Sequence, residues 1–168
     1  MFVVADTSAL VSLGTVTRDE TNPLDYLLGT QDVVLPQRVV TELEETAAYD
    51  DVSGRGAASV LDRRTRFDVR SIDLDETFPL DNGENAAVTL ANDIEAGQFL
   101  CDEFNRLALI HASLTTARLL TTPTLLAALS RAGVMSDTEA MALLSEVSDA
   151  RSWTGNSYVD RVRTMLTG

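Results

Sequence analysis

Two aspartates stand directly after the two most apolar strand-like segments of the chain. Asp6 closes the segment FVVAD, and Asp102 closes the segment QFLCD. In open α/β sheets, ligands bind in the crevice beyond the carboxyl ends of the strands, so both carboxylates are expected to point toward one site. An aspartate in this position is also a common helix N-cap, which is the alternative for each residue taken singly. Two such residues in matched contexts favour a shared functional site.

Glu84 is a third candidate, at the start of a predicted helix. The segment Asp81-Asn82-Gly83-Glu84 has the form of an N-cap followed by a glutamate three residues later, so a capping role alone would explain it. Glu84 also shares a helix face with the apolar residues Ala87, Val88 and Ala91. A carboxylate that leans toward the apolar face needs a partner, and a metal ion at the helix start would supply one.

Glu42 belongs to a helix predicted from Gln37 to about Tyr49. The apolar stripe of this helix consists of Val39, Val40, Leu43 and Ala47. At about 100° per residue, Glu42 and Glu44 both flank the stripe, whereas Glu45 points away. Periodicity therefore leaves both flanking glutamates open, with an ordinary charged helix flank as the alternative for each.

Clustered carboxylates are suited to one kind of chemistry. Mg²⁺ and Mn²⁺ prefer hard oxygen ligands, so three or four carboxylates without sulfur or imidazole suit them better than zinc. Such ions can activate a water molecule and offset charge that develops on a phosphate. The acids therefore favour a site for a hard divalent cation.

The elements that must position these acids alternate between strands and helices. Strands are predicted at Phe2 to Ala5, Asp32 to Leu35, Phe67 to Leu74, Gln98 to Cys101 and around Leu119 and Leu120. Helical patterns lie between them, including one at Ala57 to Arg66 after a loop marked by Gly54 and Gly56. This alternation predicts an α/β fold with a central, mainly parallel sheet of four to five strands and helices on both faces.

Three further helices are predicted after the last strand. Thr122-Pro123 opens one that Gly133 ends, Ser136 to Glu139 forms a capping box before Ala140 to Val147, and Asn156 to Leu166 is amphipathic. At 168 residues the chain fits one domain. We divide it into a main part over 1–135 and a C-terminal helical extension over 136–168.

The charge balance is strongly acidic. The chain has 26 Asp and Glu against 13 cationic residues, all arginine, for a formal net charge of -13. At about 1 M salt the Debye length shrinks to about 3 Å and self-repulsion is screened, so this composition is typical of a halophilic protein. It also argues against tight nonspecific binding of nucleic acid, which depends on cations.

Other reactive side chains are few. Cys101 has no partner for a disulfide and is expected to pack as a small apolar residue, and His111 lacks a second ligand at metal spacing. Ser8 has no serine-hydrolase motif around it. The absence of lysine argues against phosphate-loop enzymes and lysine-assisted phosphotransferases. No apolar run reaches the roughly 20 residues that cross a bilayer, so we expect a soluble, cytoplasmic protein.

Four segments in order resemble the PIN-domain ribonucleases, over about residues 2–135. VVADTSAL resembles the first strand with its metal-binding aspartate, VVTELEE the helix with the second acid, LDNGENAAVTLA the Gly-Glu motif, and LCDEFNRLA the strand-end acids and following arginine. TTPTLLAALSRAGVMS is similar to a helix of small prokaryotic PIN proteins. The resemblance implies catalytic Asp6, Glu42, Glu84 and Asp102, of which Asp6, Glu84 and Asp102 are metal ligands.

The resemblance also implies supporting residues and partners. Ser8 would support Asp6, and Glu103 and Arg106 would neighbour Asp102, with Arg106 either contacting a phosphate or forming an ion pair with Glu103 or a nearby acid. The expected activity is a Mg²⁺- or Mn²⁺-dependent endoribonuclease acting on RNA. Toxin-type relatives suggest a small antitoxin partner and a homodimer. The alternative is a PIN-like binding module without turnover.

Overall fold

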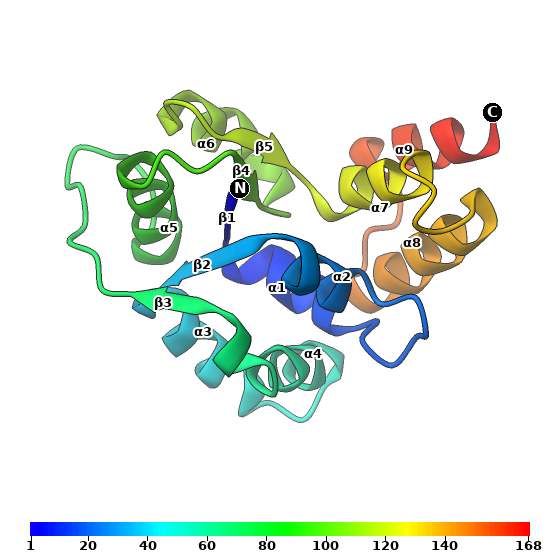
Figure 1. The fold of residues 1–168 in the computed structure, drawn as a ribbon, viewed down its shortest axis with the longest axis horizontal. Helices are drawn as coiled ribbons and strands as arrows, with labels where there is room; N and C mark the ends of the chain where they lie inside the picture. Colours follow the sequence, from blue (N-terminus) through cyan, green and yellow to red (C-terminus); the bar gives the residue numbers. More distant parts are fainter.

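Five short parallel strands form the centre of the computed structural model, which describes residues 1–168. They are β1 (Phe2–Ala5), β2 (Asp32–Pro36), β3 (Asp68–Arg70), β4 (Gln98–Leu100) and β5 (Arg118–Leu120), in the order β3-β2-β1-β4-β5 (Figure 1). In the register of the central strands, Val4 lies opposite Val34 and Phe99. The predicted α/β class and parallel sheet are confirmed.

Helices cover both faces of this sheet, as predicted. They are α1 (Thr7–Gly14), α2 (Pro23–Thr30), α3 (Gln37–Ala47), α4 (Val52–Leu61), α5 (Asn82–Asp93) and α6 (Leu107–Ser113). In Figure 1, α1, α3 and α4 lie on one side of the strands and α5 and α6 on the other. The chain builds outward from β1 to β3 and then crosses back to β4. Strand order therefore reverses between β1 and β4, which is where ligands bind in such sheets.

The central strands are buried on both faces. Val3, Val4 and Ala5 of β1 have no exposed surface, and neither has Phe99 of β4. A strand covered on both sides has no polar face, which explains why these segments read as continuous apolar runs rather than alternating ones. The first polar side chain after β1 is therefore held at the end of a rigid, fully packed strand.

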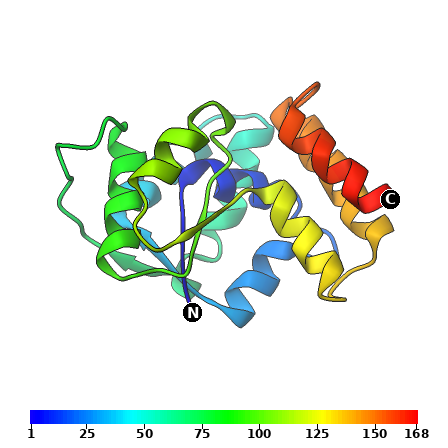
Figure 2. The ribbon, with the colours of Figure 1, turned by 90° about the horizontal axis from the view of Figure 1, so that it is seen from above.

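Three C-terminal helices pack at one end of the molecule (Figure 2). They are α7 (Thr122–Arg131), α8 (Asp137–Arg151) and α9 (Ser157–Thr167). The predicted capping box is confirmed, because Ser136 accepts from the amide of Glu139 while the Glu139 carboxylate accepts from the amide of Ser136. Buried Leu126, Leu144 and Val159 join the same apolar core as the sheet. No helix is both long and apolar enough to cross a bilayer.

Some predicted boundaries are wrong. Gly54 and Gly56 lie inside α4 rather than in a loop, because α4 packs so closely on α1 that a Cβ on Gly56 would come 2.8 Å from the carbonyl oxygen of Val11. The strand predicted from Phe67 shortens to β3, since only β2 pairs with it and their register covers three residues. A 3₁₀ turn, Phe104–Arg106, precedes α6.

Candidate active site

Asp6 lies at the end of β1 and is only 4% exposed. Its Oδ1 accepts hydrogen bonds from the Ser8 hydroxyl at 2.6 Å and from the amide of Ala9 at 3.3 Å, so Asp6 does cap α1. Its Oδ2 accepts from the thiol of Cys101 at 3.2 Å. The capping role and a buried carboxylate at the strand end therefore coexist in one residue.

Asp102 lies beside Asp6 at the end of the neighbouring strand and is 6% exposed. Its Oδ1 accepts from the amide of Thr122 at 2.7 Å, in the first turn of α7, whereas its Oδ2 is buried without a hydrogen-bond partner. The Ser8 hydroxyl that donates to Asp6 also accepts from the amide of Asp102 at 2.9 Å. Ser8 thus fixes the two strand ends relative to each other, consistent with its expected supporting position.

Glu84 is buried in the first turn of α5, with 5% of its surface exposed. Its amide donates to the N-cap Asp81 at 2.8 Å, which confirms the predicted cap. The Nε of Arg106 lies 2.8 Å from the Glu84 carboxylate. Of the two expected placements of Arg106, the structure has the ion pair, and its acid is Glu84 rather than Glu103.

Glu42 is half-buried and lies against the start of α5. A Cβ on Gly83 would come 2.7 Å from Glu42 Cδ, so a glycine at this position is what lets α5 approach the carboxyl group. The Oε1 of Glu42 is buried without a hydrogen-bond partner, whereas Glu44 and Glu45 are exposed. The structure therefore brings Glu42, and not Glu44, next to the residue preceding Glu84.

Burial makes the charged form of all four acids unfavourable. It raises the pKa of Asp6 to about 7, against the lowering effect of hydrogen bonds from Ser8 and Cys101. Burial also raises the pKa of Asp102, and that of Glu42 and Glu84, where repulsion by Asp81 adds to it. Arg106 is the one cation in direct contact with any of the four. A bound cation would offset the cost of keeping these groups ionised.

The donor chemistry fits a hard divalent cation, but the acids are not drawn together around one point. No group of three or more His, Cys, Asp or Glu side chains lies close enough to hold a metal ion in the present geometry. Two unsatisfied buried oxygens, Asp102 Oδ2 and Glu42 Oε1, are free to accept an ion. Glu103 follows Asp102 but is exposed, and its carboxylate makes no hydrogen bond.

Two residues at the site were not singled out by the sequence. Cys101 is buried as expected, yet it does more than pack, because its thiol donates to Asp6. Thr122 holds Asp102 through its backbone amide, a contact across 20 residues that no local pattern signals. The position of Cys101 directly before Asp102 was the one available sign. His111 is exposed on α6 and touches none of the four acids.

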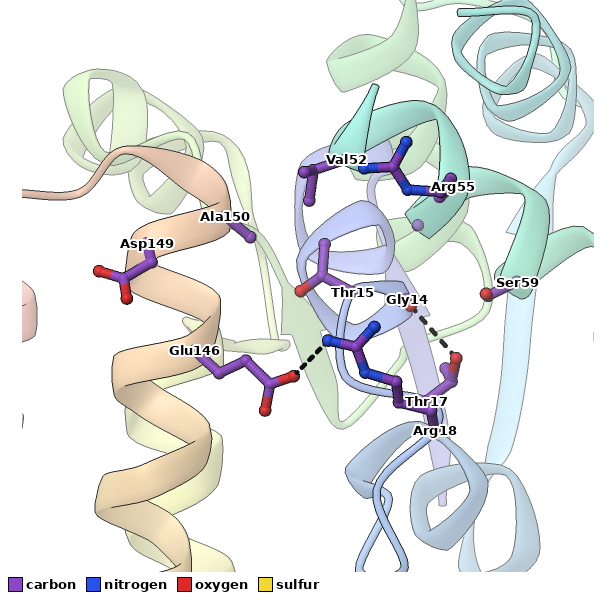
Figure 3. Close-up of a pocket in the computed structure, with 11 residues that line it drawn as sticks. Gly14, Thr15, Thr17, Arg18, Val52, Arg55, Ser59, Glu146, Asp149 and Ala150 are labelled. Atoms are coloured by element: carbon purple, nitrogen blue, oxygen red, sulfur yellow. Dashed lines mark hydrogen bonds and ion pairs between the residues drawn. The ribbon is translucent and has the colours of Figure 1, made fainter. Parts of the chain in front are cut away.

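A sizeable cavity lies away from the four acids. A crevice of about 530 Å³ separates α8 from α1 and α4, and none of the four acids lines it. Figure 3 shows Arg18 and Glu146 facing each other across this α8 crevice, 3.2 Å apart. The side chain of Arg18 is 82% exposed. An exposed ion pair of this kind is ordinary surface structure, so size alone does not mark a site.

Comparison with known proteins identifies the fold family. A family model described as DUF3368: PIN domain matches residues 2–167. No curated protein sequence matches the chain closely enough to count as a relative. The matched region includes α8 and α9, and the division predicted at residue 135 stays a prediction. The PIN domain is a nuclease-type fold. The strand ends that carry Asp6 and Asp102 lie at the reversal of strand order, where ligands bind in open α/β sheets. Since the match spans nearly the whole chain, this protein belongs to the PIN-domain family.

Proposed function

We propose that this protein is a metal-dependent endoribonuclease that hydrolyses RNA phosphodiester bonds at Asp6, Glu42, Glu84 and Asp102, called here the four-acid site. The observation that carries the proposal is the pairing of Asp6 and Asp102 at the reversal of strand order, both buried, with Asp102 Oδ2 unsatisfied. Folding gains nothing from a buried acid oxygen without a partner. A ligand that satisfies it is the simplest reason to keep it.

Asp6, Glu84 and Asp102 are the proposed ligands of Mg²⁺ or Mn²⁺, with Glu42 as a further acid beside them. A bound divalent ion would lower the pKa of the attacking water and offset charge on the phosphate. The side chains present do the positioning. Ser8 holds Asp6 against the backbone of Asp102, and the amide of Thr122 directs one Asp102 oxygen so that the other stays free.

Arg106 has a supporting role in this proposal. It neutralises Glu84 while the site is empty of substrate, and 38% of its side chain remains exposed. A planar guanidinium that is both exposed and next to the acids suits a phosphate oxygen of the bound RNA. Glu103, exposed just beyond Asp102, would add negative charge at the entrance to the site.

The direct test is cleavage of a labelled single-stranded RNA with Mn²⁺ in concentrated salt. We expect cleavage by the wild type that a chelator abolishes and that Asp102→Asn reduces by at least about 100-fold, because the substitution removes a formal charge from the ion. Glu146→Gln in the α8 crevice is the matched control and should cleave normally. Full metal-dependent activity in Asp102→Asn would overturn the assignment.

A PIN-like binding module without turnover is the second candidate. The observation that favours it is the engagement of Glu84 by Arg106, which occupies a proposed ligand. The same assay separates the two, because a binding module would retain RNA without cleaving it under any metal condition. Arg106→Gln removes the ion pair with Glu84. If this variant cleaves RNA and the wild type does not, the natural protein is an inactive binding module.

The biological setting that fits this proposal is a toxin–antitoxin pair. In this proposal a cytoplasmic, homodimeric ribonuclease toxin is held inactive by a small antitoxin protein that fills the crevice at the four-acid site. Expression should then arrest growth, and Asp6→Asn should relieve the arrest. Equal arrest by both proteins would contradict the toxin role.

A further inference from the structure

An apolar groove begins next to the four-acid site. It lies between α6, β5, the start of α7 and α9, with a volume of about 420 Å³, and its lining includes Leu107, Leu119, Tyr158 and Met165. Tyr158 and Met165 are 39% and 48% exposed, so part of each side chain is open to a ligand. Figure 2 shows α9 running beside α7 at this end of the molecule. We call this feature the α9 groove.

Two of its lining residues are chain neighbours of residues at the four-acid site. Leu107 directly follows Arg106, which pairs with Glu84. Thr121 directly precedes Thr122, whose amide donates to Asp102. A strand of RNA with its scissile phosphate at Asp102 would therefore have this groove as its adjoining surface.

The charge of the groove is the reverse of that of the whole chain. Its lining contains Arg161 and His111 and no Asp or Glu, although acids outnumber arginines 26 to 13 in the sequence. Arg161 is the one arginine of the lining, and it forms no ion pair. A cation without an acid partner beside an apolar wall is complementary to an anion that also carries apolar surface.

An aromatic stack holds Tyr158 at the rim. The ring of Tyr158 lies nearly parallel to that of Phe104, with centroids 5.5 Å apart and an angle of 18°. Trp153 packs edge-on against Phe104 at 5.0 Å. Phe104 is only two residues beyond Asp102. An exposed aromatic ring that is fixed from behind is the surface on which unpaired bases stack.

We propose that the α9 groove binds an unpaired base and the neighbouring phosphate of the RNA substrate, with Tyr158 as the stacking residue and Arg161 as the phosphate contact. The inference rests on the proposed ribonuclease function and adds a specificity-determining surface to it. It also explains how a chain of net charge -13 binds RNA. The contacts come from one local surface with a cation, because the electrostatic field of the whole protein repels the phosphates.

The test is RNA binding with a chelator present, measured by the fluorescence anisotropy of a labelled single-stranded RNA of about 12 nucleotides. Tyr158→Leu should weaken binding about tenfold, whereas Tyr158→Phe keeps the ring and should stay within about twofold. Arg161→Gln should weaken binding and lower the salt dependence by about one phosphate contact. Arg131→Gln is the control, because this exposed arginine also lacks an ion pair but lies outside the groove.

Melting temperatures of the variants show whether each one folds, and cross-linking supplies a second readout. RNA that carries one 4-thiouridine should cross-link to peptides of α9. Cross-links confined to the α8 crevice would overturn the proposal. So would Tyr158→Leu and Arg161→Gln proteins that fold and bind RNA as the wild type does. The groove would then be a site for an apolar protein segment instead.

The binding result can be separated from the outcome for catalysis. If the wild type never cleaves RNA but the groove variants lose RNA binding, the RNA-binding role of the groove is supported and the ribonuclease function is contradicted. If the groove variants bind and cleave RNA normally, the RNA-binding role of the groove is contradicted and the ribonuclease function still stands.

Discussion

The four-acid site and the α8 crevice hold charges in opposite ways. In the crevice, Arg18 and Glu146 are paired and open to solvent, with side chains 82% and 33% exposed. At the four-acid site, Asp6 and Asp102 are 4% and 6% exposed, and no arginine pairs with either. The α8 crevice is a cavity of about 530 Å³, yet the buried acids carry the higher cost of desolvation.

The difference shows which feature indicates function. Water screens the charges of the crevice, so its ion pair contributes little and its loss would matter little. Desolvation makes the buried acids expensive in the folded protein, and the surrounding structure must hold them there. Each prediction below changes one region and uses the other as its reference.

The largest effect is expected on catalysis. Asp6→Asn should reduce Mn²⁺-dependent RNA cleavage by at least about 100-fold, because the neutral amide is a poor ligand for a hard cation. Arg18→Gln should leave the rate within about twofold. Initial rates at saturating Mn²⁺ check both, and a loss in Arg18→Gln that matched the loss in Asp6→Asn would move the active site to the crevice.

The next largest effect is expected on thermal stability. A ligand at about 100 times its dissociation constant adds roughly 2.7 kcal/mol, which raises the melting temperature of a chain of this size by about 5 to 10 °C. Mn²⁺ should have this effect on the wild type and on Glu146→Gln. The shift should shrink or vanish in Asp102→Asn, and an equal shift in all three proteins would place the bound ion elsewhere.

A third prediction concerns pH without metal. The pKa of Asp6 is raised from 3.8 to about 7, so between these values the folded protein retains a proton that the unfolded chain loses. The free energy of unfolding therefore falls as pH rises through this window and levels off above about 7. Asp6→Asn lacks this loss and should gain roughly 2 to 3 kcal/mol relative to the wild type between pH 5 and 8.

Urea unfolding in chelator at several pH values measures this difference, and the titration of groups remote from Asp6 cancels between the two proteins. A constant difference across the range would mean that Asp6 is not desolvated. Arg18→Gln is the matched reference, since it should run parallel to the wild type.

The smallest effect is expected for the ion pair of the crevice. Arg18→Gln breaks the 3.2 Å contact with Glu146, but an exposed pair contributes at most about 1 kcal/mol. The urea midpoint should change little, and less still in high salt. A loss of several kcal/mol would show that the crevice holds the fold together and that the contrast between the two regions is overstated.

The sequence predicts the parts of the site that depend on local rules. Asp6 and Asp102 follow buried parallel strands, and the carboxyl ends of such strands share one edge of the sheet. Glu84 is indicated by a cap and a helical face, both of which fall within a few residues. These three positions needed no knowledge of how distant segments pack.

Contacts between distant segments could not be predicted in the same way. Glu42 and Glu44 are equivalent by helical periodicity, so the residues alone do not choose between them. The resemblance points to Glu42, and in the structure it is Glu42 that Gly83 approaches. The amide of Thr122 reaches Asp102 because β5 and α7 follow β4 in space. Gly56 was placed in a loop because glycine favours loops locally, whereas close packing of two helices accounts for it here.

The central claim is that the buried acids, and not the α8 crevice, bind the metal ion. Counting bound Mn²⁺ by electron paramagnetic resonance in the wild type, in the double variant Asp6→Asn with Asp102→Asn, and in Glu146→Gln tests it most directly. The account predicts at least one ion per chain in the wild type and in Glu146→Gln, and its loss in the double variant. Equal Mn²⁺ binding by the double variant and the wild type would contradict it.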